Sequence, residues 1–227
     1  MSEEIKIRRA TLEDVDFLVD TIVAAEKSGT DNFGLAKLFE LSEGEMRTYI
    51  KAMLEEEVDG CEFSVSSFLV ADHQGKAVSA FAGWVEGQNE DGMSSALLKS
   101  NLIGYCLPME NVMKSQSKSD IVRPLQIERE EGTYQLEYSY TLPEYRGKGI
   151  MKDIINMHIV DYQQNTPHRH QEGGIRKIQV HVFANNEAAI GTYKRCGFEI
   201  TKEYNSNNPL VEQYFPYHTI LLMERIV

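Results

Sequence analysis

The sequence reads Leu142-Pro143-Glu144-Tyr145-Arg146-Gly147-Lys148-Gly149-Ile150-Met151 at the point where a predicted strand meets a predicted helix. A helix start leaves four backbone N–H groups without intrahelical partners, and their dipoles add partial positive charge there. Gly147 and Gly149 lack the Cβ atoms that would keep an anion away from these N–H groups. Arg146 and Lys148 add full positive charges beside them. The stretch therefore predicts a phosphate-binding loop.

This loop is neither of the two commonest phosphate-binding motifs. A Walker loop requires Ser or Thr directly after its Gly-Lys pair, whereas Gly149 stands in that position here. A dinucleotide fingerprint requires three glycines, and the loop has two. Taken alone, the segment is equally compatible with an ordinary glycine-containing turn, so a second motif is needed to decide.

That second motif runs from Asn186 through Tyr193 to Gly197-Phe198, directly after a predicted strand at 176–183. Together the two segments resemble the GNAT superfamily of acyl-CoA-dependent N-acetyltransferases. That family carries Arg/Gln-x-x-Gly-x-Gly/Ala after one central strand, and Asn, a short helix, Tyr and a closing Gly-Phe after the next. The family positions are occupied here, in order, by Arg146, Gly149, Asn186, Tyr193, Gly197 and Phe198. The close resemblance covers residues 134–200.

The resemblance implies an α/β (mixed α+β) fold with a mixed, mainly antiparallel central sheet of about seven strands flanked by helices. The pattern of apolar residues agrees with it. Strands are predicted at 4–9, 67–72, 77–86, 133–142, 176–183, 198–204 and 217–227. Helices are predicted behind Thr11, at 35–41, behind Ser42, at 94–107, 108–119 and 149–162, and between Asn186 and Cys196. We expect one domain, 1–227, with a long insertion at 87–133.

Acetyl-CoA is the cosubstrate that the resemblance implies, and its diphosphate is expected on the first motif. The expected cofactor-binding residues there are Leu142, Arg146, Gly147, Lys148, Gly149, Ile150 and Met151. Met151 departs from the family, which has Gly or Ala at this place. Because Met151 keeps its N–H and only adds bulk, we expect altered packing rather than lost binding. The pantetheine arm is expected between two parallel strands that splay apart, where Asn186 contacts it and caps the next helix.

Transfer of an acyl group to an amine requires a neutral amine and a stabilised leaving thiolate. Only about one alkyl amine in 2,500 is neutral at pH 7, so a base is useful. Glu137, on the strand before the loop, is the candidate base; the alternative is that it belongs to a polar cross-strand pair. The alternation of the strand predicts that it shares a face with Gln135, Ser139 and Thr141. Tyr193 stands where the family places the tyrosine that protonates the coenzyme A sulfur, so the resemblance implies that its hydroxyl bonds this sulfur; the alternative is an aromatic packing role.

Composition limits the other possibilities. A net charge of −12 makes nucleic acid and anionic membranes poor partners. The N-terminus lacks a signal-peptide pattern and apolar runs are short, so we expect a cytoplasmic protein. Cys61, Cys106 and Cys196 are expected to be reduced core thiols, and His168 and His170 a surface loop rather than a metal site. No metal is expected.

The sequence thus predicts an N-acetyltransferase that acts by direct transfer in a ternary complex, as a monomer or homodimer, on an amine-bearing small molecule or peptide. The alternative is a non-catalytic acyl-CoA-binding sensor or interaction module. We expect the insertion 87–133 and the segment 29–41 to form walls of the acceptor site; the alternative for the insertion is a role in packing or dimerisation. The aromatic and acidic residues expected in these walls are Asp31, Phe33, Phe39, Glu40, Glu90, Asp91, Tyr105 and Glu110.

Overall fold

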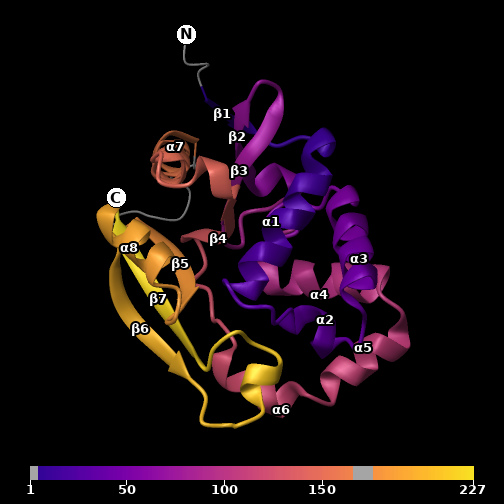
Figure 1. Cartoon of the computed structure of the whole chain (residues 1–227). Coiled ribbons are helices and arrows are strands. Elements are labelled where there is room, and N and C mark those ends of the chain that lie inside the picture. The colour runs from indigo at the N-terminus through magenta and orange to yellow at the C-terminus, as the bar shows by residue number, and fades with distance from the viewer. Residues whose placement is uncertain (1–4, 166–175) are drawn as a thin grey trace.

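The computed structural model describes residues 5–165 and 176–227, and its centre is one mixed sheet (Figure 1). The described residues form seven strands in the spatial order β1-β2-β3-β4-β5-β7-β6. Their bounds are β1 (Lys6–Arg9), β2 (Phe68–His73), β3 (Lys76–Val85), β4 (Tyr134–Thr141), β5 (Lys177–Phe183), β6 (Glu199–Asn205) and β7 (Thr219–Ile226). Neighbouring strands are antiparallel except β4 and β5, which are parallel. The predicted mixed, mainly antiparallel sheet is confirmed.

Helices cover both faces of this sheet (Figure 1). They are α1 (Val15–Lys27), α2 (Gly34–Leu38), α3 (Glu43–Glu55), α4 (Ser95–Cys106), α5 (Met109–Gln116), α6 (Ser119–Val122), α7 (Ile150–Asn165) and α8 (Glu187–Arg195). The apolar sides of α1, α3 and α4 share one buried cluster with Phe68 and Trp84. The apolar side of α7 packs in a second cluster, with Phe81 and Tyr193. The sheet thus separates two cores.

Local sequence signals account for where α3 begins and where α8 ends. Ser42 and Glu45 form the predicted capping box of α3: Ser42 Oγ accepts from the backbone N–H of Glu45, and the Glu45 carboxylate accepts from that of Ser42, at 3.3 and 2.8 Å. The predicted helix at 108–119 is the shorter α5, and a separate helix, α6, begins at Ser119. Gly197 follows α8 with φ +83°, the left-handed conformation that ends a helix.

The parallel strands β4 and β5 separate soon after they pair. Their register joins only Tyr134 to Ile178, Gln135 to Gln179 and Leu136 to Val180. From Glu137 to Thr141, β4 continues beside β3 without a described partner on the β5 side. This is the splayed pair of strands that the sequence predicts, and it leaves backbone polar groups of β4 available to a ligand.

A bulge at Tyr138 corrects the predicted faces of β4. The register of β4 against β3 shifts between Phe81 and Ala82, and Tyr138 has φ +58°. As a result Tyr138 reaches the same side as Glu137: its hydroxyl donates to Glu26 on α1 at 2.7 Å. Ser139 instead contacts Tyr193 on the α8 side. The prediction that Glu137, Ser139 and Thr141 share one face is therefore wrong, because one extra residue reverses the alternation.

The insertion 87–133 is built into the α1 side of the molecule. Leu98, Leu102 and Leu107 belong to the same buried cluster as α1 and α3. Glu86, 3% exposed at the end of β3, accepts from the backbone N–H and the hydroxyl of Ser95, at 2.8 and 2.6 Å. Because one sheet and a shared core include the segments on both sides of the insertion, we propose that the chain folds as one domain.

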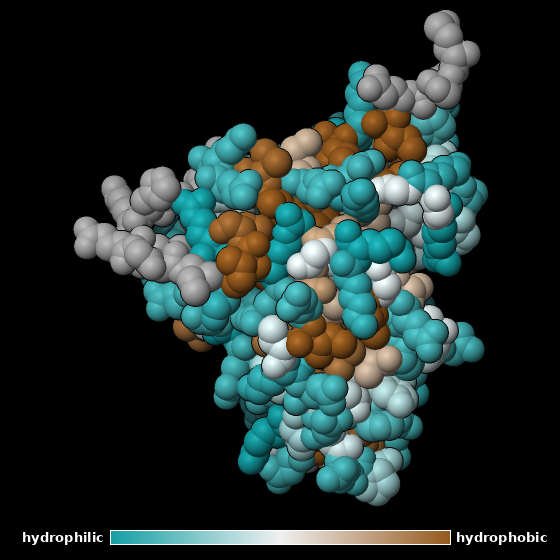
Figure 2. Space-filling view, turned by 90° about the vertical axis from the view of Figure 1, so that its left-hand side faces the viewer, coloured by the Kyte–Doolittle hydropathy of each residue, from teal (hydrophilic) through white to brown (hydrophobic). Residues whose placement is uncertain are grey.

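The opposite side of the molecule, which carries α7 and β6, is shown in Figure 2. Hydrophilic residues cover most of it, and hydrophobic residues gather in separate areas between them. Some of the exposed hydrophobic residues lie on these elements, including Met157, Val160 and Ile200. Scattered apolar residues of this kind are ordinary on a folded protein. Among the described residues, no helix is both long and apolar enough to cross a membrane.

Candidate active site

The predicted phosphate loop lies between β4 and α7 with an open approach. Gly147 and Gly149 have φ +72° and +82°, and an added Cβ at either would meet no atom of the described chain within 4 Å. The short 3-10 turn Pro143–Tyr145 precedes them, and α7 begins at Ile150. The positive φ values explain why glycine stands at both positions. The free space beside them leaves the first N–H groups of α7 accessible to an anion.

Two cations flank the loop, and aromatic rings hold them. Arg146 donates from Nε to the carbonyl of Thr141 at 3.0 Å, and its guanidinium lies 5.8 Å from the Tyr140 ring centre. Lys148 Nζ lies 4.7 Å from the Tyr145 ring centre. Met151 is half-buried and packs against the α7-side core. Its bulk is thus accommodated by packing, as the sequence predicts.

Asn186 stands at the start of α8 and connects it to α1. Its side-chain oxygen accepts from the backbone N–H of Ala189 at 3.2 Å, which confirms the predicted cap. Its Nδ2 donates to Ser28 Oγ at 3.2 Å. Ser28 ends α1 in a left-handed conformation, with φ 45°. The start of α8 and the end of α1 therefore meet beside the opening between β4 and β5.

Tyr193 combines a packed ring with a hydroxyl at this opening. The side chain is 4% exposed, and its ring lies 6.1 Å from that of Phe81 and 6.0 Å from that of Phe198. The hydroxyl lies 3.3 Å from Ser139 Oγ on β4. Burial raises the pKa of Tyr193 to about 12, so at neutral pH it is a hydrogen-bond donor. Both sequence interpretations of this residue, packing and hydroxyl chemistry, are compatible with its position.

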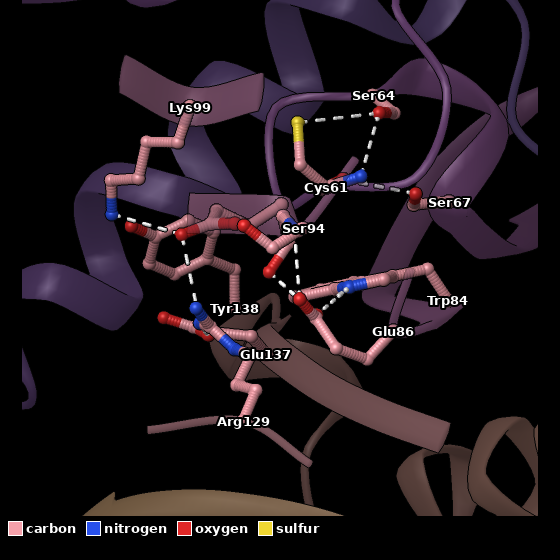
Figure 3. A network of polar contacts seen from close by, with 12 residues as sticks. Cys61, Ser64, Ser67, Trp84, Glu86, Ser94, Lys99, Arg129, Glu137 and Tyr138 are labelled. Atoms are coloured by element: carbon pink, nitrogen blue, oxygen red, sulfur yellow. Dashed lines mark hydrogen bonds and ion pairs between the residues drawn. The ribbon is translucent and has the colours of Figure 1, made fainter. Parts of the chain in front are cut away.

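Glu137 lies in a buried cluster of ionised groups on the α1 side of the sheet. Its carboxylate forms an ion pair with Arg129, which is 9% exposed, and Arg129 also lies 3.6 Å from Glu62. Lys99 Nζ lies 2.9 Å from Glu62, which is fully buried. Figure 3 shows Lys99, Arg129, Glu137 and Tyr138 pointing toward one another. The partner of Glu137 is therefore a cation of the insertion rather than a residue of a neighbouring strand.

The shared environment affects the two carboxyls in opposite directions. Burial raises the pKa of Glu137, although the nearby Arg129 opposes this. The cations Lys99 and Arg129 overcome the burial of Glu62 and lower its pKa from 4.5 to about 2. A proton entering the pair therefore goes to Glu137. A buried carboxylate with raised proton affinity suits a general base.

Two cavities meet at the opening between β4 and β5. A cleft of about 960 Å³ lies along the phosphate loop, and it is lined by Arg146, Gly147, Gly149 and Ile150. A second cavity, of about 530 Å³, extends to the ionised cluster and is lined by Glu26, Lys99, Arg129 and Glu137. The residues that line both are Ala25, Ser28, Ser139, Asn186, Ala189 and Tyr193. A ligand on the phosphate loop would therefore lie next to a second ligand beside Tyr193 and Glu137.

The insertion lines the second cavity, but through residues that the sequence did not indicate. Lys99, Leu125, Ile127 and Arg129 line it. Of the eight aromatic and acidic residues expected in its walls, none is among those that line it. Phe33 and Phe39 are buried in the core, and the other six, Asp31, Glu40, Glu90, Asp91, Tyr105 and Glu110, are exposed. That prediction is wrong because charge and aromatic character alone do not show which side of each segment faces inward.

Lys99 and Arg129 were missed, and the sequence contains a weak signal for one of them. Lys99 follows Leu97-Leu98 and precedes Leu102-Ile103, so it lies in the most apolar part of its helix. The two histidines His168 and His170 lie outside the described residues. Within the described ranges, no group of three or more His, Cys, Asp or Glu side chains is arranged to hold a metal ion. The three cysteines are free; Cys61 and Cys196 are buried and Cys106 is half-buried.

Comparisons with known proteins identify a matching family and similar folds. The model of the acetyltransferase (GNAT) family matches residues 38–198, more than half of the chain. An N-acetyltransferase from Staphylococcus aureus Mu50 has a similar structure, with a TM-score of 0.67 at 18% identity over 97% of this chain and 100% of the other. A ribosomal-protein-alanine N-acetyltransferase from Brucella melitensis gives 0.53 at 15% identity, over 98% and 99%.

A further similar structure is a Salmonella typhimurium protein solved with its cofactor acetyl-CoA, with a TM-score of 0.53 at 12% identity over 98% of this chain and 94% of the other. At these identities the structural likeness shows a shared fold only. A comparison with curated proteins gave no match.

Proposed function

The chain belongs to the acetyltransferase (GNAT) family, and from this premise we propose that it transfers the acetyl group of acetyl-CoA directly to an amine within a ternary complex. The observation that carries the proposal is the meeting of the two cavities at Ser139, Asn186 and Tyr193. Such a junction lets a thioester and an amine approach each other from opposite sides. Holding both reactants in one geometry is itself a large part of catalysis.

The cofactor is proposed to lie along the first cleft. The N–H groups at the start of α7, together with Arg146 and Lys148, bind the diphosphate. The amides of the pantetheine arm pair with the backbone of β4 from Glu137 to Thr141, where β5 has separated from it. Asn186 contacts the same arm. Acetyl-CoA then supplies the thioester carbonyl beside the hydroxyl of Tyr193.

Tyr193 and Glu137 are proposed as the catalytic residues. A phenol with pKa near 12 donates a hydrogen bond to the sulfur as negative charge develops on it, and it does so without ionising. Glu137 accepts the proton that the acceptor ammonium loses, directly or through water. Its ion pair with Arg129 keeps the carboxylate in place.

A covalent acetyl-enzyme is not part of the proposal. Cys196 lines the cofactor cleft, but burial raises the pKa of its thiol, and a thiol is a poor nucleophile compared with a thiolate. Cys61 and Cys106 are not among the residues that line either cavity. The amine therefore attacks the thioester itself: the C–N bond forms, the C–S bond breaks, the attacking nitrogen gives up its second proton to the sulfur, and coenzyme A leaves as the thiol.

The fold does not select the acceptor. Similar structures include one named for agmatine and one named for ribosomal-protein alanine, at 13% and 15% identity. We propose an amine-bearing acceptor.

The proposal is tested by initial rates of thiol release with acetyl-CoA and an amine varied together. Direct transfer gives intersecting double-reciprocal lines. Parallel lines, together with an acetylated protein detected by intact mass after incubation with acetyl-CoA alone, would overturn it. Failure of every amine tested, under conditions where acetyl-CoA binding is demonstrated by calorimetry, would argue for a non-catalytic acyl-CoA-binding role instead.

A further inference from the structure

The second cavity is divided into a charged inner part and an apolar outer part. The outer part combines segments that are far apart in the sequence: Leu125 and Ile127 of the insertion, Phe183 of β5, and Phe215 and Ile220 near the C-terminus. Leu125 and Ile220 are 2% and 4% exposed, and the other three pack against them. A ligand whose apolar body extends from Tyr193 into this part removes apolar surface from water, and this burial favours binding.

The inner part has one more acid than base. Glu26 and Glu137 are the carboxylates among the described residues that line the cavity, and Glu62 lies directly behind Lys99 and Arg129. Three carboxyls thus face two cations. Glu62 Oε2 and Arg129 Nε have no hydrogen-bond partner in the described part of the chain. The charged cluster therefore keeps unused hydrogen-bonding capacity. Arg123 also lines the cavity, but it is exposed and already paired with Asp120.

The excess of one carboxyl over the cations favours acceptors with a single positive charge. The cluster is neutral when it holds one further positive charge, either a proton on Glu26 or Glu137, whose pKa values burial raises, or one ammonium group in place of that proton. A second cation at the far end of the molecule would lie among Leu125, Phe215 and Ile220, where no described carboxylate lines the wall. An acceptor carboxylate would add a fourth acid to three. Both additions bury a charge without a partner, which is costly.

We infer that the acceptor is a primary amine with a single positive charge on an apolar body, of the arylalkyl or long alkyl class. This inference rests on the proposed function, because it takes the second cavity as the acceptor site. The ammonium lies among Glu26, Glu137 and Tyr193, and the apolar body extends toward Leu125 and Phe215. Each methylene that the outer part buries should tighten binding by about fourfold.

The test is calorimetric titration of amines into the protein saturated with coenzyme A, which cannot react. The probes are 2-phenylethylamine, ethylamine with the same charge and no body, agmatine with a second cation, and phenylalanine with an added carboxylate. We expect 2-phenylethylamine to bind at least about tenfold more tightly than each of the other three. Equal or tighter binding of agmatine or phenylalanine, or no binding of 2-phenylethylamine, would overturn the inference.

Two variants test separately the preference for a single positive charge and the preference for an apolar body. Glu26→Gln removes the excess charge. It should weaken the binding of 2-phenylethylamine about tenfold and leave the binding of coenzyme A unchanged. Ile127→Glu places a carboxylate at the apolar end and should shift the preference toward agmatine. Glu90→Gln, an exposed acid of the insertion, is the matched control and should change neither. If Glu26→Gln or Ile127→Glu fails to fold, the comparison of the four probes on the wild type still decides.

The two proposals fail separately. Acetylation of agmatine in preference to 2-phenylethylamine would overturn the acceptor class and leave acetyl transfer standing. Preferential binding of 2-phenylethylamine without acetylation of any amine would confirm the site and overturn the transfer.

Discussion

Arg129, near the end of the insertion, forms an ion pair with Glu137 on β4, the strand that leads into the phosphate loop. The insertion therefore supplies the cations of the buried cluster, while α1, β4 and the segment before β2 supply its carboxyls. A charge buried without a partner is costly. The insertion is thus a wall whose cations oppose the rise that burial causes in the pKa of Glu137, and removing it would leave three buried acids without counterions.

Tyr193→Phe should lower kcat more than it raises KM for acetyl-CoA. The hydroxyl acts on the sulfur only as charge develops there, so its loss is felt mainly in the transition state. We expect a loss of roughly 10- to 1,000-fold in kcat. The measurement is single-turnover thiol release, which isolates the chemical step.

The matched control for Tyr193→Phe is Tyr134→Phe. Tyr134 is equally buried and its hydroxyl also has a partner, His158 Nδ1 at 2.8 Å, but it lines neither cavity. The Tyr134→Phe protein should be somewhat less stable than the wild type and should have the same rate of thiol release. Wild-type single-turnover rates in Tyr193→Phe would reduce Tyr193 to a packing residue.

Gly149→Asp and Gly149→Asn should separate charge from backbone strain in the phosphate loop. Gly149 has φ +82°, so either side chain is strained there, and the two are nearly the same size. Only Asp adds a negative charge to the place where the diphosphate is expected. We expect Gly149→Asp to weaken the binding of acetyl-CoA at least about tenfold more than Gly149→Asn does, as measured by calorimetry. Equal affinities in the two folded variants would show that no anion binds at Gly149.

Glu62→Gln should destabilise the protein in a pH-dependent way. Glu62 is fully buried between Lys99 and Arg129, and removing one partner of such a group costs about 3 kcal/mol or more. The pKa of Glu62 is lowered from 4.5 to about 2, so the native state binds fewer protons than the unfolded state in this range. The stability that the carboxylate contributes is therefore present above pH 4.5 and is lost as the pH falls toward 2.

Urea unfolding from pH 7 to pH 3 measures this difference between Glu62→Gln and the wild type. Asp16→Asn is the control, because Asp16 pairs with Lys51 at 2.7 Å but both side chains are largely exposed, at 85% and 44%. It should cost far less than Glu62→Gln. A Glu62→Gln protein with wild-type stability at pH 7 would mean that Lys99 and Arg129 are solvated without it.

The parts of the site that depend on local chain geometry were predictable from the sequence. The glycines at 147 and 149, the cap at Asn186 and the place of Tyr193 in α8 each follow from a short motif, because helix starts and positive φ values demand particular residues. The splayed strands followed from the resemblance. These features require no knowledge of distant contacts.

The part of the site that faces α1 was not predictable, because it depends on contacts across the chain. The bulge at Tyr138 has no signal in an alternating strand sequence, yet it decides which residues face α1. Arg129 and Lys99 resemble ordinary solvated cations until Glu62 and Glu137 are placed beside them. Conversely, Tyr105 is 75% exposed although its aromatic character suggested a wall of the site. Charge and aromaticity indicate a function only after their direction is known.

The attachment of α4 gives the sharpest test of the insertion. Replacing residues 90–120 by a short linker is the obvious experiment, but it would also remove Lys99 from Glu62 and Leu98 and Leu102 from the core. A smaller change removes only the anchor. Ser95→Ala deletes the hydroxyl that donates to Glu86 at 2.6 Å and leaves Glu86 with Trp84 Nε1, at 3.1 Å, and the Ser95 backbone N–H.

Because the lost hydrogen bond is buried and its acceptor is charged, Ser95→Ala should cost about 1–3 kcal/mol of stability. If α4 positions Lys99 in the acceptor cavity, KM for the best amine should rise about threefold or more while KM for acetyl-CoA stays unchanged. Ser115→Ala is the control, since among the described residues the Ser115 hydroxyl donates only to the nearby Val112 carbonyl and Ser115 lines neither cavity. A Ser95→Ala enzyme that loses stability but keeps both KM values would show that this anchor supports the fold without shaping the acceptor site.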